Sequence, residues 1–253
     1  MVPVVVQFLL MNADKNSAPS AHKSSGPVTL AVDIGGSGLK AMLLDPAGKP
    51  LSERQRIETP AVPTPRAVLA ALDRLISPLG HFDRASVGFP GVTKHGITYT
   101  AVNLHPLWMN FHFQAELEKR WKKPVRVAND AAIQGYGAVK GKGIEMIVTL
   151  GTGMGSALYV DSHLCPLELG HHPWKKKTYE DYVGRRGLDK LGKKGWNKHV
   201  LEAIEQIRFT FNFDHLYLGG GNTKKIDVAL PKDVSIVSNE TGLLGGVALW
   251  RNE

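Results

Sequence analysis

Residues 28–44, Val28-Thr-Leu-Ala-Val-Asp-Ile-Gly-Gly-Ser-Gly-Leu-Lys-Ala-Met-Leu-Leu44, carry the strongest structural signal in the chain. Two apolar runs, Val28 to Ile34 and Leu39 to Leu44, flank a turn with glycine at positions 35, 36 and 38. Short apolar runs bounded by turn residues predict buried strands. Glycine lets a tight turn present several backbone N–H groups to an anion at close range. The segment therefore predicts a strand, a phosphate-binding turn and a second strand.

The second half of the chain repeats this arrangement. A strand is predicted over Ile144 to Leu150, followed by the turn Gly151-Thr-Gly-Met-Gly155 and a return strand from Ser156 to Val160. A third glycine cluster, Gly219 to Gly221, follows the apolar run His215 to Leu218. Between these turns apolar strands alternate with helical patterns, which is typical of an α/β protein. The pattern indicates two similar halves, as an internal duplication would produce.

The boundary between the halves is predicted at Asn129-Asp130. An Asn-Asp pair is a common helix N-cap, and a helix is expected to follow from Ala131 to Val139. We therefore expect a disordered tail over residues 1–26, a small N-terminal α/β lobe over 27–128 and a larger C-terminal α/β lobe over 129–253.

Bulk composition indicates a packed cytoplasmic protein. The 253 residues are 43% hydrophobic and 21% charged, which is typical of a globular protein. The single cysteine, Cys165, excludes an intramolecular disulfide and a zinc site with two thiolates.

No apolar run is long enough to cross a bilayer, so no membrane partner is expected. Val2 to Met11 is apolar but lacks the basic region of a signal peptide, which disfavours secretion. The alternatives are a disordered tail or a start codon assigned too early.

The formal net charge of +8 predicts an anionic partner. Nine Lys and Arg residues crowd positions 175–198: Lys175, Lys176, Lys177, Arg185, Arg186, Lys190, Lys193, Lys194 and Lys198. We call these residues the basic segment. It carries no zinc-finger, basic-zipper or RNA-recognition signature, so no nucleic acid partner is expected. A phosphate-rich substrate or polymer fits the basic segment, and a solvated basic surface is the alternative.

Three glycine turns after strands make phosphate binding the favoured interpretation, although any one of them alone would be only a tight turn. Asp33 stands at a strand end, where its carboxylate can bind Mg²⁺, and Lys40 can reach a phosphate. Neither a Walker A loop nor a Rossmann glycine motif is present. The predicted phosphate-binding residues are Gly35, Gly36, Ser37, Lys40, Gly151, Thr152, Gly153, Gly219, Gly220, Gly221, Asn222 and Lys224, with Asp33 as the metal ligand.

Five motifs in this order resemble the ROK family of sugar kinases: Asp33-Ile-Gly-Gly-Ser-Gly-Leu-Lys40, Gly88-Phe-Pro-Gly91, Val127-Ala-Asn-Asp130, Leu150-Gly-Thr-Gly-Met-Gly155 and Glu168-Leu-Gly-His171. Within the family, residues 168–182 and Leu218-Gly-Gly-Gly-Asn-Thr-Lys224 are similar to the polyphosphate glucokinases. The resemblance extends from about Val28 to the C-terminus. It implies a two-lobed actin-like ATPase fold (sugar kinase/Hsp70, ribonuclease H-like) and a homodimer.

The resemblance assigns Asp130 as the base that accepts the proton of the sugar 6-hydroxyl, with Asn129 beside it on the sugar. A carboxylate that orients the hydroxyl suits phosphoryl transfer, where positioning and charge neutralisation do most of the work. Without the resemblance, the pair reads as an N-cap only.

The other implied sugar contacts are Asn103, Glu168, His171 and Glu180. Glu168 and His171 lie three residues apart, and their side chains can accept or donate hydrogen bonds to sugar hydroxyls. The loop after Asn103 departs from the family pattern, and Asn103 alone reads as a turn residue. Glu180 corresponds to a further glutamate at the anomeric end of the sugar in many ROK kinases.

No zinc is expected. Many ROK kinases carry a zinc-binding cysteine cluster where this chain has Pro173-Trp-Lys-Lys-Lys177. A site built from His163, Cys165, His171 and His172 would use expected ligand types. It would, however, take His171 from the sugar, and residues 163 and 165 are predicted to lie in a hairpin loop.

Together these features predict a polyphosphate-dependent glucokinase that uses glucose, inorganic polyphosphate or ATP, and Mg²⁺. An ATP-dependent kinase for glucose, mannose or an amino sugar is the alternative. A sugar-responsive transcriptional regulator is disfavoured because residues 1–26 are too short for a DNA-binding domain.

Overall fold

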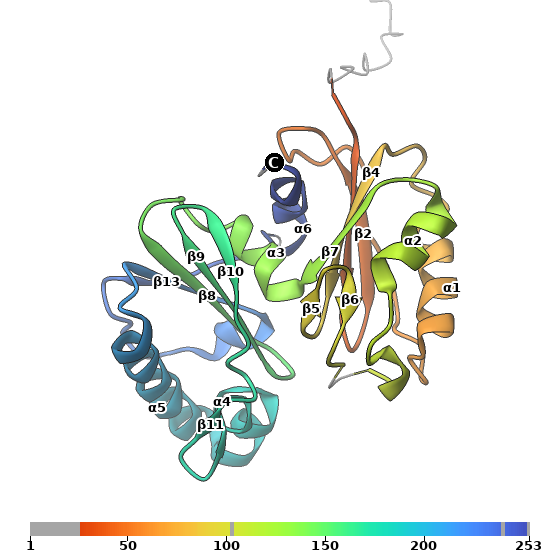
Figure 1. Ribbon diagram of the computed structural model, residues 1–253. Coiled ribbons are helices and arrows are strands. Elements are labelled where there is room, and N and C mark those ends of the chain that lie inside the picture. The colour runs from red at the N-terminus through yellow and green to blue at the C-terminus, as the bar shows by residue number, and fades with distance from the viewer. Residues whose placement is uncertain (1–25, 102–103, 239–240, 252–253) are drawn as a thin grey trace, which may run out of the picture.

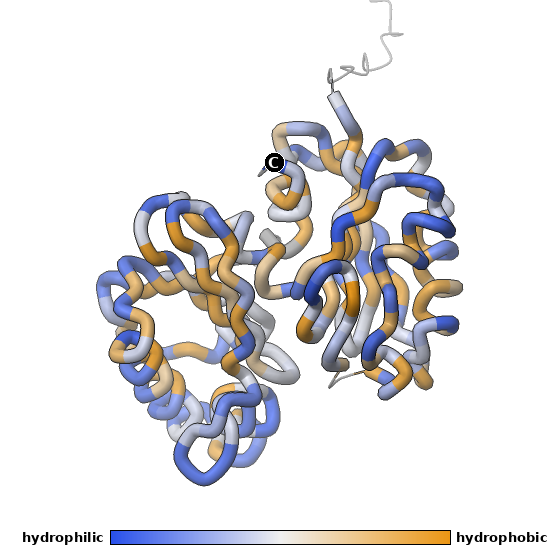
Figure 2. The backbone as a smooth tube through the Cα atoms, in the orientation of Figure 1, coloured by the Kyte–Doolittle hydropathy of each residue, from blue (hydrophilic) through white to orange (hydrophobic). Residues whose placement is uncertain are grey.

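The structure, a computed structural model, describes residues 26–101, 104–238 and 241–251. Two five-stranded sheets lie on either side of the short helix α3 (Asp130–Tyr136) (Figure 1). We call the halves built around these sheets the first and second lobes. Apolar residues follow the strands inside each lobe, whereas the loops at the periphery are hydrophilic (Figure 2). Each sheet therefore has its own hydrophobic core.

The first sheet contains, in spatial order, β3 (Gln55–Ile57), β2 (Leu39–Leu44), β1 (Thr29–Ile34), β4 (Arg84–Phe89) and β7 (Val125–Asn129). β1 pairs antiparallel with β2, which returns directly after the glycine turn. β1 pairs parallel with β4, which follows a crossover connection. The parallel strands β1, β4 and β7 end at the same edge, which places Asp33 and Asp130 near each other.

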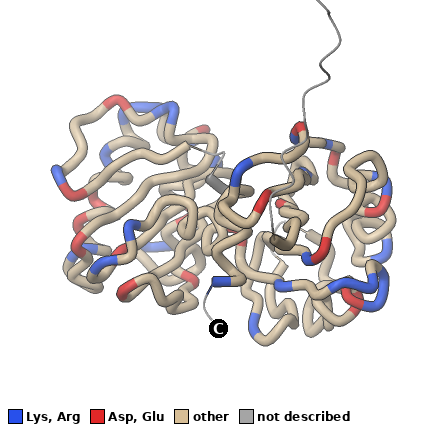
Figure 3. The backbone as a smooth tube through the Cα atoms, turned by 90° about the horizontal axis from the view of Figure 1, so that it is seen from above, with Lys and Arg blue, Asp and Glu red and all other residues tan. Residues whose placement is uncertain are grey.

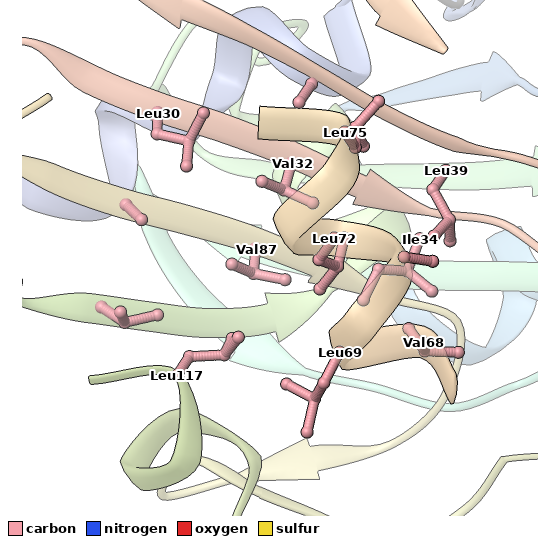
Figure 4. Packing of buried hydrophobic residues seen from close by; sticks show 14 of the residues in the cluster. Leu30, Val32, Ile34, Leu39, Val68, Leu69, Leu72, Leu75, Val87 and Leu117 are labelled. Carbon is pink, nitrogen blue, oxygen red and sulfur yellow. The ribbon is translucent and has the colours of Figure 1, made fainter. Parts of the chain in front are cut away.

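Two helices cover one face of this sheet. Helix α1 (Pro65–Ile76) begins with Thr64, whose Oγ1 accepts a hydrogen bond from the Ala67 N–H at 3.2 Å, and proline occupies its first position. Its apolar stripe packs on alternate residues of β1 and β4 (Figure 4). Helix α2 (Phe113–Trp121) adds Leu117 to the same cluster. The short elements nearby are β5 (Thr93–Lys94), β6 (Ile97–Thr98) and η1 (Pro106–Trp108).

The second sheet contains, in spatial order, β10 (His163–Pro166), β9 (Met154–Val160), β8 (Ile144–Leu150), β13 (His215–Gly219) and β14 (Val234–Ile236). Helix α5 (Arg185–Phe211) covers it, with the fully buried Trp196 in the same core cluster. The remaining elements are β11 (Pro173–Trp174), β12 (Lys177–Thr178), α4 (Tyr179–Val183) and η2 (Gly221–Lys225).

The C-terminal segment returns to the first sheet. It forms two short helices in succession, α6 (Thr241–Leu244) and η3 (Gly245–Trp250). Val247 packs on Ala31, which points away from α1 because successive strand residues face opposite sides of a sheet. Ser86 Oγ donates to the Gly246 carbonyl at 2.6 Å and accepts from Trp250 Nε1 at 2.8 Å. The last described residues therefore pack with the first lobe. The predicted division of the chain into lobes at residue 129 stays a prediction.

Other predicted boundaries shift for local reasons. Helix α5 begins at Arg185 and bends at Gly192, where φ is 66°. Helix α3 ends at Tyr136 because Gly137 caps it. The prediction that His163 and Cys165 lie in a loop was wrong, because both belong to β10 and pair with β9. Among the helices that the structure describes, none combines the length and the apolar character needed to span a membrane.

Candidate active site

A cleft of about 280 Å³ is formed by residues of both lobes. Its walls come from the turn after β1, the start of α3, the turn after β8, the segment before α4 and the turn after β13. The structure brings together fifteen of the predicted site residues here: Asp33, Gly35, Gly36, Ser37, Lys40, Asn129, Asp130, Gly151, Thr152, Gly153, Glu168, His171, Glu180, Gly220 and Gly221.

Asn129 is the N-cap of α3. Its Oδ1 accepts hydrogen bonds from the N–H groups of Ala131 at 2.9 Å and Ala132 at 3.3 Å. Its Nδ2 donates to the Gly91 carbonyl at 3.1 Å. The capping role thus belongs to Asn129, and Asp130 becomes the first helical residue with its carboxylate lining the cleft.

Asp130 is the most electrostatically perturbed carboxylate of the cleft. Burial, together with the negative charges of Asp33 and Glu168, raises its pKa to about 7, although the N–H of Ala131 opposes this shift. That N–H donates to Oδ1 at 2.8 Å. A carboxylate with a pKa near neutrality can accept a proton at physiological pH, because it is then partly ionised and also basic enough.

The first glycine turn is held from two sides. Gly35 N–H bonds to the Gly38 carbonyl at 3.0 Å, and Thr59 Oγ1 donates to the Gly35 carbonyl at 2.6 Å. Asp33 and Lys40 lie directly opposite each other in the β1–β2 register, and Lys40 Nζ is 2.7 Å from Asp33 Oδ2. The turn therefore presents a carboxylate and an ammonium group together.

Three predicted sugar contacts meet on the second lobe. His171 Nε2 lies 3.5 Å from Glu180 Oε1, and His171 Nδ1 lies 3.9 Å from Glu168 Oε1. Burial raises the pKa of Glu168, and the nearby His171 opposes this shift. Gly170 holds the Glu168 carboxylate and the backbone of Glu180, since its N–H donates to Glu168 Oε1 at 3.0 Å and its carbonyl accepts from the Glu180 N–H at 3.0 Å.

The two glycine turns of the second lobe lie side by side. Asn222 Nδ2 donates to the Gly151 carbonyl at 2.7 Å, which ties the turn after β13 to the turn after β8. Gly220 has φ of 87°, and a Cβ there would lie 2.4 Å from the Leu150 carbonyl oxygen, so only glycine fits. The predicted phosphate-binding residues Gly219, Asn222 and Lys224 do not line the cleft. Asn103 lies outside the described residues.

Six further residues line the cleft and were not among the predicted site residues: Pro90, Gly91, Gln134, Thr149, Met154 and Gly155. Four of them belong to motifs quoted above. Thr149 and Gln134 do not. Helical periodicity could have identified Gln134, since it stands four residues after Asp130 and residues at this spacing share a helix face.

Part of the basic segment is neutralised by local acids. Lys175 pairs with Glu202 and also lies over the Trp174 ring, while Arg186 lies 2.9 Å from Asp181. Lys193 lies 2.9 Å from Asp227, and Arg185 is 4.0 Å from Asp189. Basic and acidic positions are interspersed over both lobes (Figure 3). Within the described part of the chain, five members form no salt bridge: Lys176, Lys177, Lys190, Lys194 and Lys198.

The chain is similar in sequence to curated proteins. The chain is 30% identical over 233 residues to the polyphosphate glucokinase of Mycobacterium leprae, covering 87% of this chain and 69% of the relative. It is 28% identical over 235 residues to the polyphosphate glucokinase of Mycobacterium tuberculosis strain H37Rv, covering 85% and 87% respectively.

Solved structures show the same fold. The inorganic polyphosphate/ATP-glucomannokinase of Arthrobacter sp. strain KM matches with a TM-score of 0.81 at 29% identity, over 89% of this chain and 100% of that chain. A ROK family glucokinase of Streptomyces griseus matches with a TM-score of 0.69 at 20% identity, over 89% and 100%. The predicted actin-like ATPase fold is thereby confirmed. Residues 29–187 match the ROK family model, and the chain belongs to the ROK family.

Proposed function

We propose that this protein is a polyphosphate-dependent glucokinase, which transfers a phosphoryl group from inorganic polyphosphate, or alternatively from ATP, to the 6-hydroxyl of glucose. One observation carries the proposal. Asp130, with its pKa raised to about 7, stands in one cleft with the Glu168–His171–Glu180 cluster and the glycine turns. In this arrangement the carboxylate of Asp130 can accept a proton between two substrates. The sugar hydroxyl would lie on the side of the Glu168–His171–Glu180 cluster, and the phosphate donor on the side of the glycine turns.

In the proposed reaction, Asp130 orients the sugar 6-hydroxyl and accepts its proton as the bond to phosphorus forms. The transferring phosphoryl group needs little covalent assistance, so a correctly placed base and charge neutralisation suffice. The start of α3 fixes the carboxylate, since the Ala131 N–H holds Oδ1 at 2.8 Å.

The glucose hydroxyls are expected to bind Glu168, His171 and Glu180. Carboxylates accept hydroxyl protons, and the imidazole of His171 can donate or accept. The contacts of His171 with Glu168 at 3.9 Å and Glu180 at 3.5 Å keep the three groups convergent before a sugar arrives.

Mg²⁺ is expected to accompany the donor, with Asp33 holding it. The chemistry of the donor set fits: Mg²⁺ prefers oxygen ligands and commonly takes one or two carboxylates plus waters and substrate phosphates. Among the described residues no group of three or more His, Cys, Asp or Glu residues could hold a metal ion. When bound, Mg²⁺ would neutralise phosphate charge. Lys40, 2.7 Å from Asp33, supplies a second positive charge there.

Polyphosphate as the donor is supported by two observations. The relatives with 28–30% identity across most of this chain are named polyphosphate glucokinases. Five lysines of the basic segment are not neutralised by salt bridges in the described part of the chain, so they remain available to successive phosphates of a polymer. A homodimer and a cytoplasmic location, expected from the resemblance and from the single cysteine, are part of the proposal.

An ATP-dependent hexose or amino-sugar kinase is the second candidate. The observation that favours it is 36% identity over 137 residues, about half of this chain, to the N-acetylmannosamine kinase of Escherichia coli strain SE11.

The test is formation of glucose 6-phosphate with Mg²⁺, comparing inorganic polyphosphate and ATP as donors at low and high salt. We expect turnover with polyphosphate that falls steeply with salt, because each neutralised phosphate adds to the salt dependence. Turnover with ATP alone would favour the second candidate. Absence of product with glucose, mannose and amino sugars would refute a hexose kinase.

A further inference from the structure

We propose that Gln134 is a further donor-binding residue, whose carboxamide donates a hydrogen bond to a phosphate oxygen beside the transferring phosphoryl group. The inference rests on the proposed function and names a contact in the same cleft. Nothing in the glycine motifs points to this residue.

The position of Gln134 follows from helix geometry. It stands four residues after Asp130 on α3, about 6 Å further along the axis on the same face. The residue is 8% exposed and lines the cleft. The carboxamide of Gln134 therefore extends the cleft wall along α3 from Asp130, on the side of the turn after β13.

Gly219 leaves the space that this carboxamide occupies. A Cβ on Gly219 would lie 2.8 Å from Gln134 Nε2 and 3.0 Å from Oε1. The φ of Gly219 lies outside the left-handed region, so backbone conformation does not require glycine there, in contrast to Gly220 with φ of 87°. The amide of Gln134 therefore lies directly against a turn that is expected to bind phosphate.

The amide is anchored and still able to donate. Gln134 Nε2 donates to the Ser238 carbonyl at 3.3 Å. A carboxamide nitrogen carries two N–H groups, so one such bond leaves the second for a ligand. A phosphate oxygen is a strong acceptor, and a hydrogen bond to a charged group is stronger than one between neutral groups.

A neutral donor also suits this place electrostatically. Asp33 and Glu168 already raise the pKa of Asp130 through their negative charges. A carboxylate at position 134 would add a third charge and repel the donor, whereas a carboxamide binds phosphate oxygens without either effect. Because Gln and Glu are equal in size, replacing Gln134 by Glu tests the effect of a negative charge alone at this position.

The experiment compares wild type with Gln134→Ala, Gln134→Glu and the control Gln206→Ala, which removes an exposed glutamine from α5. Binding is measured by calorimetry with Mg²⁺ plus inorganic tripolyphosphate, with Mg²⁺ plus a non-hydrolysable ATP analogue and, separately, with glucose. We expect Gln134→Ala to weaken donor binding about tenfold, as loss of one hydrogen bond to a charged group would. Gln134→Glu is expected to weaken it further. Glucose affinity should stay within about threefold in both variants, and the control should match wild type.

Equal loss of donor and glucose binding, or unchanged donor binding with a lowered melting temperature, would show that Gln134 only anchors the segment at Ser238 and would overturn the inference. So would a wild type that binds neither donor. Because binding is read without turnover, a wild type that binds donor through Gln134 but phosphorylates no glucose would refute the proposed function and leave the inference standing.

Discussion

Lys40 Nζ lies 2.7 Å from the Asp33 carboxylate, across the register pair next to the first glycine turn. The two side chains are 34% and 23% exposed, and both line the cleft. A partly solvated ion pair of this kind contributes only about 0–1 kcal/mol to stability. Its importance is therefore expected in the function of the cleft, where the pair fixes a carboxylate and an ammonium group beside the phosphate turn.

The first prediction concerns this pair. Lys40→Met should raise the KM for the phosphate donor about tenfold, since it removes a charge-assisted phosphate contact. The KM for glucose should change little, and the free energy of unfolding should fall by less than about 1 kcal/mol. Initial-rate kinetics and urea unfolding measure these quantities, with the exposed Lys49→Met as control. A donor KM equal to that of the control would exclude Lys40 from donor binding.

The second prediction concerns the proposed base. Asp130→Asn should lower kcat about 10³-fold, within the range expected for loss of general base catalysis. Glucose affinity, measured by calorimetry, should stay within about threefold because the other sugar-binding side chains are intact. A kcat close to that of wild type would remove Asp130 from proton transfer.

The third prediction is the pH dependence of catalysis. The pKa of Asp130 is raised to about 7, mainly by burial, and only the ionised form can accept a proton. The value of kcat/KM for the free enzyme should therefore rise with pH and level off above about 7, with a slope of one below it. The profile is measured from initial rates with both glucose and polyphosphate kept well below their KM values, so that it reports the free enzyme. A profile that is flat from pH 5.5 to 8 would contradict the assignment.

The fourth prediction is the pH dependence of stability. Folding raises the pKa of Asp130 from 3.8 to about 7, so the folded state binds this proton more tightly. The stability contribution of the protonated group is complete below pH 3.8 and is lost as pH rises toward 7. Asp130→Asn should therefore gain stability relative to wild type across this range.

The full shift corresponds to about 4 kcal/mol, which partial solvation of the cleft reduces to about 1–3 kcal/mol. Guanidinium unfolding at pH 5 and pH 8 measures the difference between the two proteins. If that difference were the same at both pH values, the pKa of Asp130 would be close to its ordinary value.

The fifth prediction concerns the attachment of the C-terminal segment to the first lobe. The guanidinium groups of Arg84 and Arg126 lie 5.0 and 4.4 Å from the Trp250 ring centroid, and Ser86 accepts the indole N–H. Trp250→Ala should lower the free energy of unfolding by about 2–4 kcal/mol, through lost packing and cation–π contacts. The control Phe209→Ala, at a residue that is 80% exposed, should change it by less than about 0.5 kcal/mol. Equal effects would mean that the segment is not held by Trp250.

Local signals predicted the elements that carry the cleft. The apolar run ending at Ile34 and the glycines after it determine the first turn, because strand burial and φ freedom are properties of neighbouring residues. The Asn-Asp pair likewise predicted the start of α3, since a cap is satisfied by N–H groups two and three residues on. The proposed roles of Asn129 and Asp130 in the reaction came from the five family motifs in order, because the Asn-Asp pair alone predicts only a helix cap.

Longer-range features could not be read in this way. Elements whose partners lie far along the chain, such as β14 and the C-terminal segment, carry weak local patterns and form because a sheet edge or face is available. The spacing from Asp130 places Gln134 on the helix face of the cleft, but its contact with Gly219 could not be predicted, because Gly219 comes from a distant strand end.

The sequence alone determined the strand–turn–strand units, the cap at Asn129 and the order of the family motifs, because each depends on residues within a few positions of one another. Only the tertiary structure decided that His171 lies 3.5 Å from Glu180, and that burial, together with the charges of Asp33 and Glu168, raises the pKa of Asp130 to about 7. These properties arise from burial and from charges on different strands, and packing of the two lobes around α3 sets both.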